Sequence, residues 1–169
     1  MPPATSTREN ALAALKTTLA AVAKGAAYNY TFDDVLRLDG PWWERVDIDN
    51  YGGNTIVFVE EGETAHEPET QDGKYVSTME VFIDAITRYK PDSDNPLQQT
   101  TEVKSTIRSK LLGDLVKSVM ANDSLDGNAE YGVWIKDDAP ITVDLIDQER
   151  WTGVFTRFEV KYQLDEDAP

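Results

Sequence analysis

The residues that could perform chemistry are few in this sequence. It contains one histidine, His66, and no cysteine. This composition excludes disulfides, thiolate zinc sites, cysteine nucleophiles and metal sites that need two histidines. His66 stands in the acidic run 60–73, which has few apolar neighbours to hold a ring in a fixed geometry. Acid–base catalysis needs such a geometry, so we expect a solvated histidine without a catalytic role.

Three acidic turns have the composition of loops that bind divalent cations. Segment 122–127 places oxygen-bearing side chains and a glycine as a calcium loop does, but Val133 stands where that loop needs a glutamate. Segments 47–50 and 92–95 are similar clusters of Asp and Asn. Exposed turns are the simpler interpretation, and adventitious binding of Ca²⁺ or Mg²⁺ stays open. No phosphate-binding glycine motif occurs, so we predict no catalytic set, no cofactor and no dedicated metal site.

Capping signals and apolar spacing predict two helices. The first starts at a capping box from Ser6 to Glu9, in which the serine oxygen accepts from the Glu9 amide and the glutamate reaches back. It ends near Gly25. The second covers about 95–121 and is led by an Asn-Pro pair. The apolar stripes are Leu12, Leu15, Leu19 and Val22 in the first helix, and Val103, Ile107, Leu111, Leu115 and Val119 in the second.

Alternating or compact apolar runs predict the strands. The closing strand is the clearest, because Val154, Phe158, Val160, Tyr162 and Leu164 alternate with polar residues. In the long strand 76–89, one face is apolar and the other is expected to be wet. The predicted strands cover 35–38, 45–48, 55–59, 76–89, 131–136, 141–146 and 153–164.

The order of these elements predicts one α+β domain over residues 1–169. Strands follow one another in runs, so we expect an antiparallel or mixed β-sheet with the two main helices packed on one face. Residues 60–73 hold six acids and no base, which predicts a mobile, solvated loop. Residues 165–169 form an acidic C-terminal tail. No run of about 18 apolar residues occurs, so we expect no membrane span.

Charge is strongly segregated along the chain, whose formal net charge is −15. Residues 1–38 hold four bases and three acids, and residues 103–122 hold four bases and one acid. The segments 39–102 and 123–169 carry the acid excess. The helices are therefore positive and the strands and loops negative. Such a chain is poorly suited to bind nucleic acid, since phosphate binding needs clustered Lys and Arg.

The Trp42-Trp43 pair has two interpretations. One ring can anchor its loop on the core while the other covers it. Alternatively, the pair is an exposed aromatic anchor for another subunit, because Trp is enriched at interface hot spots.

The layout resembles the tail terminator (minor tail) proteins of long-tailed bacteriophages. Order and spacing carry the resemblance over about residues 8–164, because this family has no signature motif. The matching features are the Leu-spaced first helix, the strand 56–59 that leads into acidic residues 60–63, the strand 76–89, the Pro-led second helix and the closing strand 153–162.

This resemblance implies a structural virion protein and not an enzyme. Such proteins form a ring, usually a hexamer, that caps the tail tube, stops its polymerisation and offers the surface for head joining. The implied partners are the tail tube protein, a head-completion or connector protein and the tape-measure protein, and DNA passes through the channel without specific binding. The implied location is the head-proximal end of the tail, after assembly in the host cytoplasm. Candidate interface residues are Trp42, Trp43, Lys104, Arg108, Lys110, Lys117, Glu60, Glu61 and Glu63, with the bases meeting acid of the next subunit and the acids rimming the channel.

Three alternatives stay open. The first is another head–tail joining or tail-completion protein. The second is a small acidic Ca²⁺-binding module. The third is salt adaptation, in which the acidity has no partner.

Overall fold

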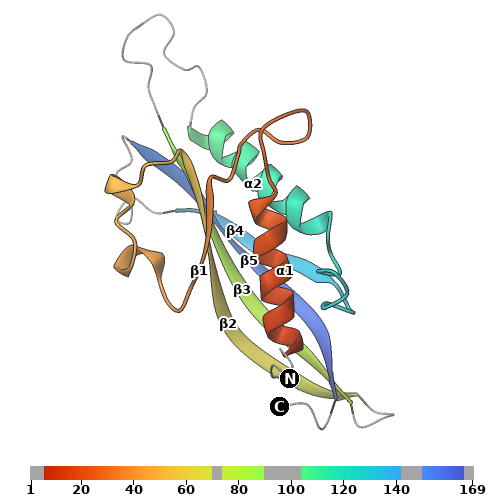
Figure 1. Ribbon diagram of the computed structural model, residues 1–169. Coiled ribbons are helices and arrows are strands. Elements are labelled where there is room, and N and C mark those ends of the chain that lie inside the picture. The colour runs from red at the N-terminus through yellow and green to blue at the C-terminus, as the bar shows by residue number, and fades with distance from the viewer. Residues whose placement is uncertain (1–5, 70–73, 90–103, 142–149, 166–169) are drawn as a thin grey trace, which may run out of the picture.

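The computed structural model describes residues 6–69, 74–89, 104–141 and 150–165. They form a mixed five-stranded sheet with both helices on one face, as expected (Figure 1). The sheet order is β1-β2-β3-β5-β4, with β1 parallel to β2 and the other neighbours antiparallel. The elements are α1 (Thr7–Ala20), β1 (Asp34–Leu38), η1 (Trp42–Glu44), η2 (Ile48–Asn50), β2 (Thr55–Glu69), β3 (Lys74–Arg88), α2 (Lys104–Met120), β4 (Val133–Pro140) and β5 (Trp151–Asp165).

Helix α1 starts at the predicted cap and ends earlier than predicted. Ser6 Oγ accepts from the Glu9 amide at 3.2 Å, whereas the Glu9 carboxylate accepts from Arg37. The helix ends at Ala20, and Ala21 caps it with φ −81°. The prediction that Gly25 terminates the helix was wrong, because a right-handed cap needs no residue with positive φ.

The principal core lies between the helices and the sheet. The predicted stripe of α2 is buried from Ile107 to Val119, and it packs on the buried face of β5. The first part of the predicted second helix, 95–103, lies outside the described residues. The large side chains at the centre of this core are Leu12, Leu15, Leu19, Met79, Ile83, Leu111, Leu115, Phe158 and Tyr162.

A second core covers part of the opposite sheet face, which we expected to be solvated. Segment 39–54 folds over this face through η1 and η2, and Trp42 stacks on Phe58 with ring centroids 5.1 Å apart. The strand predicted at 45–48 is therefore wrong. The buried members are Trp42, Ile48, Ile56, Phe58, Ile86, Ile141 and Trp151.

The acidic run forms a strand over residues 60–69, so the predicted mobile loop is wrong there. Strand β2 continues to Glu69 and pairs with β3, with one irregularity between Glu61 and Thr64. Backbone pairing with β3 satisfies the peptide groups, and the side chains of Glu63 and Glu67 are exposed, so a strand tolerates this acid. Residues 70–73 lie outside the described residues.

Strand β4 also departs from the prediction. The strand predicted at 131–136 starts at Val133 and continues through residues 137–140, which pair with β5 up to Pro140 opposite Val154. A strand predicted at 141–146 lies mostly outside the described residues. Of the acidic tail, Asp165 ends β5 and the rest lies outside them as well.

At Gly153, the adjacent strand β3 and the residue after β4 approach β5 too closely for any side chain. A β-carbon there would lie 2.7 Å from Ile141 Cδ1 and 2.8 Å from the Ala85 carbonyl oxygen. Gly153→Ala should therefore lower the free energy of unfolding by about 1–3 kcal/mol, the range for overpacking. Chemical denaturation measures this loss. Gly52→Ala is the matched control, since no atom lies within 4 Å of its added carbon, and an equal loss in both variants would contradict the prediction.

Candidate functional site

His66 lies on β2, where its exposed ring has one structural partner. Its Nδ1 is 2.7 Å from the hydroxyl of buried Ser77 on β3. Across the described ranges, no three His, Asp or Glu side chains gather into a group that could hold a metal ion. The prediction that His66 is a loop residue was wrong, because β2 extends through it.

Two of the three acidic turns are hydrogen-bonded turns, as the simpler interpretation predicts. Asp47 Oδ1 accepts from the amides of Asp49 and Asn50 and so caps η2. Asn122 Oδ1 accepts from the Asp126 amide at 3.1 Å, and the chain then turns through residues with positive φ. The acidic turn at 92–95 lies outside the described residues.

Strand β4 forms an edge of the sheet and exposes large apolar side chains. Among the described strands it pairs with β5 alone, and seven of its eight residues are exposed, Val133 being the exception. Trp134 is 58% exposed, Ile135 41% and the preceding Tyr131 39%. Trp134 and Ile135 are consecutive in the strand and so point to opposite faces of the sheet. Exposed apolar side chains on an open strand edge are typical of an association surface. The sequence pattern does not reveal this site, because a Trp-Ile pair in a strand is equally typical of a core.

The tandem tryptophans have different environments. Trp42 is buried in the second core, so its assignment to a candidate interface was wrong. Trp43 is 47% exposed, and its ring meets Trp42 edge-on at 5.7 Å. The first interpretation, an anchor ring with a covering ring, is the observed one.

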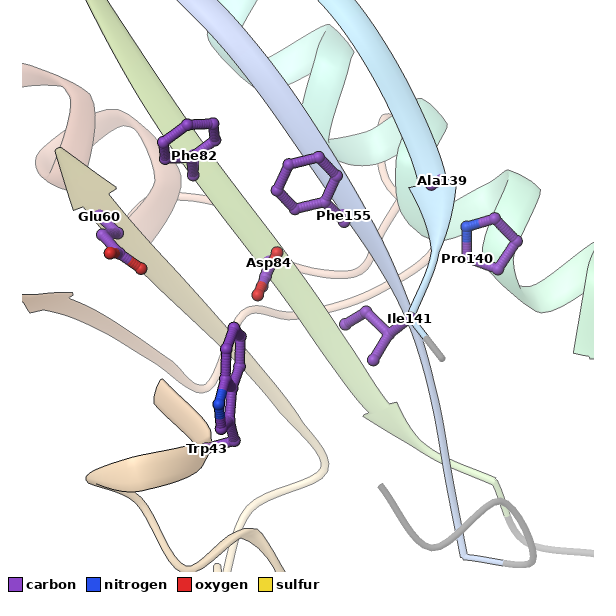
Figure 2. A pocket seen from close by; sticks show the side chains of 8 residues that line it. All are labelled: Trp43, Glu60, Phe82, Asp84, Ala139, Pro140, Ile141 and Phe155. Carbon is purple, nitrogen blue, oxygen red and sulfur yellow. The ribbon is translucent and has the colours of Figure 1, made fainter. Parts of the chain in front are cut away.

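Trp43 also lines a pocket of about 390 Å³ on the sheet face opposite the helices (Figure 2). Its walls are mainly apolar, and Phe82 and Phe155 stack there with centroids 5.9 Å apart. Asp84 lies between these rings and Trp43 (Figure 2). The lining residues are Trp43, Glu60, Phe82, Asp84, Ala139, Pro140, Ile141 and Phe155.

The Asp84 carboxylate has one hydrogen-bonded oxygen and one without a partner. The indole N–H of Trp42 donates to Oδ2. Oδ1 is buried and has no hydrogen-bond partner among the described residues. Burial raises the pKa of Asp84 to about 6, and the nearby Glu60 adds to this, while the Trp42 hydrogen bond opposes it. The ionised carboxylate of Asp84 is therefore less stable in the folded protein than in water.

Asp84 should make the protein less stable as the pH rises. Its pKa is about 6 in the folded protein against an ordinary value of 3.8, so the folded state holds its proton longer than the unfolded state. The free energy of unfolding should therefore fall as the pH rises from about 4 to about 6. The total loss is up to about 3 kcal/mol, since one pKa unit corresponds to roughly 1.4 kcal/mol. Asp84→Asn should be more stable than wild type at pH 7.5 and similar to it at pH 4. Urea unfolding at both values tests this, and equal differences at the two pH values would contradict it.

The charged candidates are largely engaged within the chain. Glu61 pairs with Arg8 and Arg37, so it is neutralised by its own subunit. Glu60 is half-buried at the pocket, where burial raises its pKa against the effect of Arg45. Of the three candidate acids, Glu63 alone is classed as exposed.

The four basic candidates lie on α2. Lys117 donates to the Ala27 carbonyl oxygen at 2.8 Å and lies over the Tyr28 ring, and Lys104 lies over the Tyr89 ring. Arg108 lines a surface cleft of about 220 Å³ beside β4. Lys110 is half-buried. None of these bases lies at the aromatic pocket.

In comparisons with known proteins, no family model and no curated protein matches this chain. Among the helices that the structure describes, none combines the length and apolar character needed to cross a bilayer.

Proposed function

We propose that this protein is a ring-forming tail terminator that caps the tail tube of a long-tailed bacteriophage, stops its growth and presents the surface for head joining. The order of elements that carries the resemblance supports this proposal, and the α+β fold is compatible with it. The tube protein, a connector protein and the tape-measure protein are the proposed partners, at the head-proximal end of the tail.

The observation that carries the proposal is the exposed apolar edge at β4. A ring of identical subunits needs two different, complementary surfaces on each copy. The two sheet edges differ in this way, because β1 is short and half-buried, whereas β4 is exposed and carries Trp134 and Ile135. We propose that the β4 edge of one copy packs against the next copy.

The charge of the chain supports a ring through which DNA passes without adhering. Six copies would carry about −90 formal charges at −15 each, and charges are screened beyond about 8 Å at physiological salt. Exposed acids remain on β2 at Glu63 and Glu67. Assembly should therefore improve with added salt or with a tube end present.

Light scattering combined with negative-stain imaging tests assembly. We expect ring-sized particles in wild type and monomers in Trp134→Asp, whereas Met120→Asp should still assemble. Met120 is a matched control, since it is 43% exposed but lies at the end of α2. If Trp134→Asp still formed rings, the proposal that the β4 edge is the contact between copies would be contradicted.

Two further assays test the terminator activity itself. Added protein should stop tail tubes from lengthening in vitro, and a mobility-shift assay at low salt should show no binding to duplex DNA. Tubes that grow on regardless, or tight DNA binding, would overturn the terminator proposal.

A further inference from the structure

We infer that the aromatic pocket between Trp43 and β4 binds a basic side chain, preferably arginine, presented by a partner protein. The inference concerns the free subunit and does not depend on ring formation. It rests on the combination of apolar walls, a half-bonded carboxylate and the lack of any base among the described residues that line the pocket.

The walls of the pocket suit the apolar stem of a long side chain. Pro140 and Ile141 lie at the end of β4, and the stacked Phe82 and Phe155 come from β3 and β5 (Figure 2). The half-exposed ring of Trp43 stands at another side of the cavity (Figure 2). Arginine and lysine bury such stems on apolar surface, and a guanidinium group stacks favourably on aromatic faces.

The carboxylate supplies the specificity. Asp84 Oδ1 is a buried acceptor without a partner, and a buried acceptor left unpaired is costly. A guanidinium group donates through several N–H groups in a fixed fork, so it can bind Oδ1 while Trp42 keeps its bond to Oδ2. Glu60 adds a second negative charge at the same pocket.

A cationic side chain is a better occupant than an anion or an uncharged ligand. The two ionisable groups that line the pocket are both acids, and the chain as a whole has a formal net charge of −15. Both features attract cations and repel anions. An uncharged apolar ligand would leave the Asp84 oxygen unpaired.

Capped tripeptides Ala-Xaa-Ala, in which Xaa is arginine, lysine, citrulline or norleucine, are the probes. Citrulline keeps the shape of arginine and removes its charge, and norleucine keeps only the stem. NMR titration of the free subunit follows the indole N–H signals, because Trp42 is bonded to Asp84 and Trp43 lines the pocket. We expect saturable shifts of these two signals with arginine, weaker ones with lysine and none with citrulline or norleucine.

Variants separate the carboxylate from the general negative charge of the protein. Asp84→Asn should weaken arginine binding at least tenfold while the fold is retained. Asp123→Asn removes the same charge from an exposed turn after α2 and should leave binding unchanged. If both variants weakened arginine binding equally, binding would depend only on the net charge of the protein, and the inference would be overturned.

The dependence of binding on pH gives an independent readout. A carboxyl group with a pKa of about 6 is about one-tenth ionised at pH 5, so arginine should bind about tenfold more weakly there than at pH 7.5. The charged groups facing Asp84 are Glu60 on β2 and, acting on Glu60, Arg45 after η1. Glu60→Gln should keep the pH dependence and Asp84→Asn should lose it.

Two results overturn the inference outright. One is binding of citrulline equal to that of arginine. The other is the lack of any indole shift with arginine up to about 50 mM, well beyond the millimolar range of weak contacts. Failure of the ring and tube assays would leave these titrations unaffected, so the two proposals fail separately.

Discussion

Replacing Phe158 by alanine should lower the free energy of unfolding by about 3–5 kcal/mol, which is the range for a buried aromatic residue. Phe158 is fully buried in β5, the strand that lies between β3 and β4. Its ring belongs to the principal core, together with the buried residues of α2. The large side chains of this core, such as Leu111 and Leu115, are themselves fully buried, and a cavity left among packed side chains adds to the loss.

Phe155→Ala is the matched control for this substitution. Phe155 lies on the same strand but faces the opposite side, where it is half-buried at the aromatic pocket. Because its ring loses less contact, the loss of stability should be less than half of that in Phe158→Ala. Urea unfolding with fluorescence detection compares the two variants, and a loss under about 1 kcal/mol for Phe158→Ala would show that the side chain is not part of the core.

Asp114→Ala should lower the free energy of unfolding by about 3 kcal/mol or more, because it removes three hydrogen bonds to a charged group, and such bonds contribute about 1.5–3 kcal/mol each. Asp114 is buried in α2. Its carboxylate accepts from the amides of Asn29 and Tyr30 at 2.7 and 2.8 Å and from the Asn29 side chain at 2.8 Å. These bonds tie the segment that follows α1 to the second helix.

Asp114→Asn separates the hydrogen bonds from the negative charge. The amide oxygen can still accept from both backbone groups, and the side-chain amide of Asn29 can rotate to accept from the new nitrogen. Stability should then fall by no more than about half of the loss in Asp114→Ala. Hydrogen exchange at the amides of Asn29 and Tyr30 should accelerate strongly only in Asp114→Ala, and unchanged exchange in that variant would contradict the prediction.

Several features were predictable because they depend on neighbours close in sequence. The Ser6 cap, the stripe of α2 from Ile107 to Val119 and the alternation in β5 each follow from contacts within one element. The α+β class followed from the order of these elements. The single histidine and the lack of cysteine also limited the possible metal ligands and nucleophiles, because these follow from composition alone.

The candidate sites depended on contacts that sequence patterns do not contain. Residues 60–69 have the composition of a loop, and β3 makes them a strand by pairing with their peptide groups. Segment 39–54 covers part of one sheet face, so Trp42 becomes core and Asp84 becomes a half-buried acid that is hydrogen-bonded to it.

The sequence by itself therefore determined the start of the first helix, the buried stripe of the second, the closing strand, the α+β class, the acidic charge and the lack of cysteine beside a single histidine. Tertiary structure alone decided which apolar residues stay exposed. Trp134 and Trp151 both lie in strands, yet one is 58% exposed and the other fully buried. The physical reason is position in the fold: Trp134 stands on the edge strand β4, whereas Trp151 on β5 belongs to the second core and contacts the ring of Tyr51 in the covering segment.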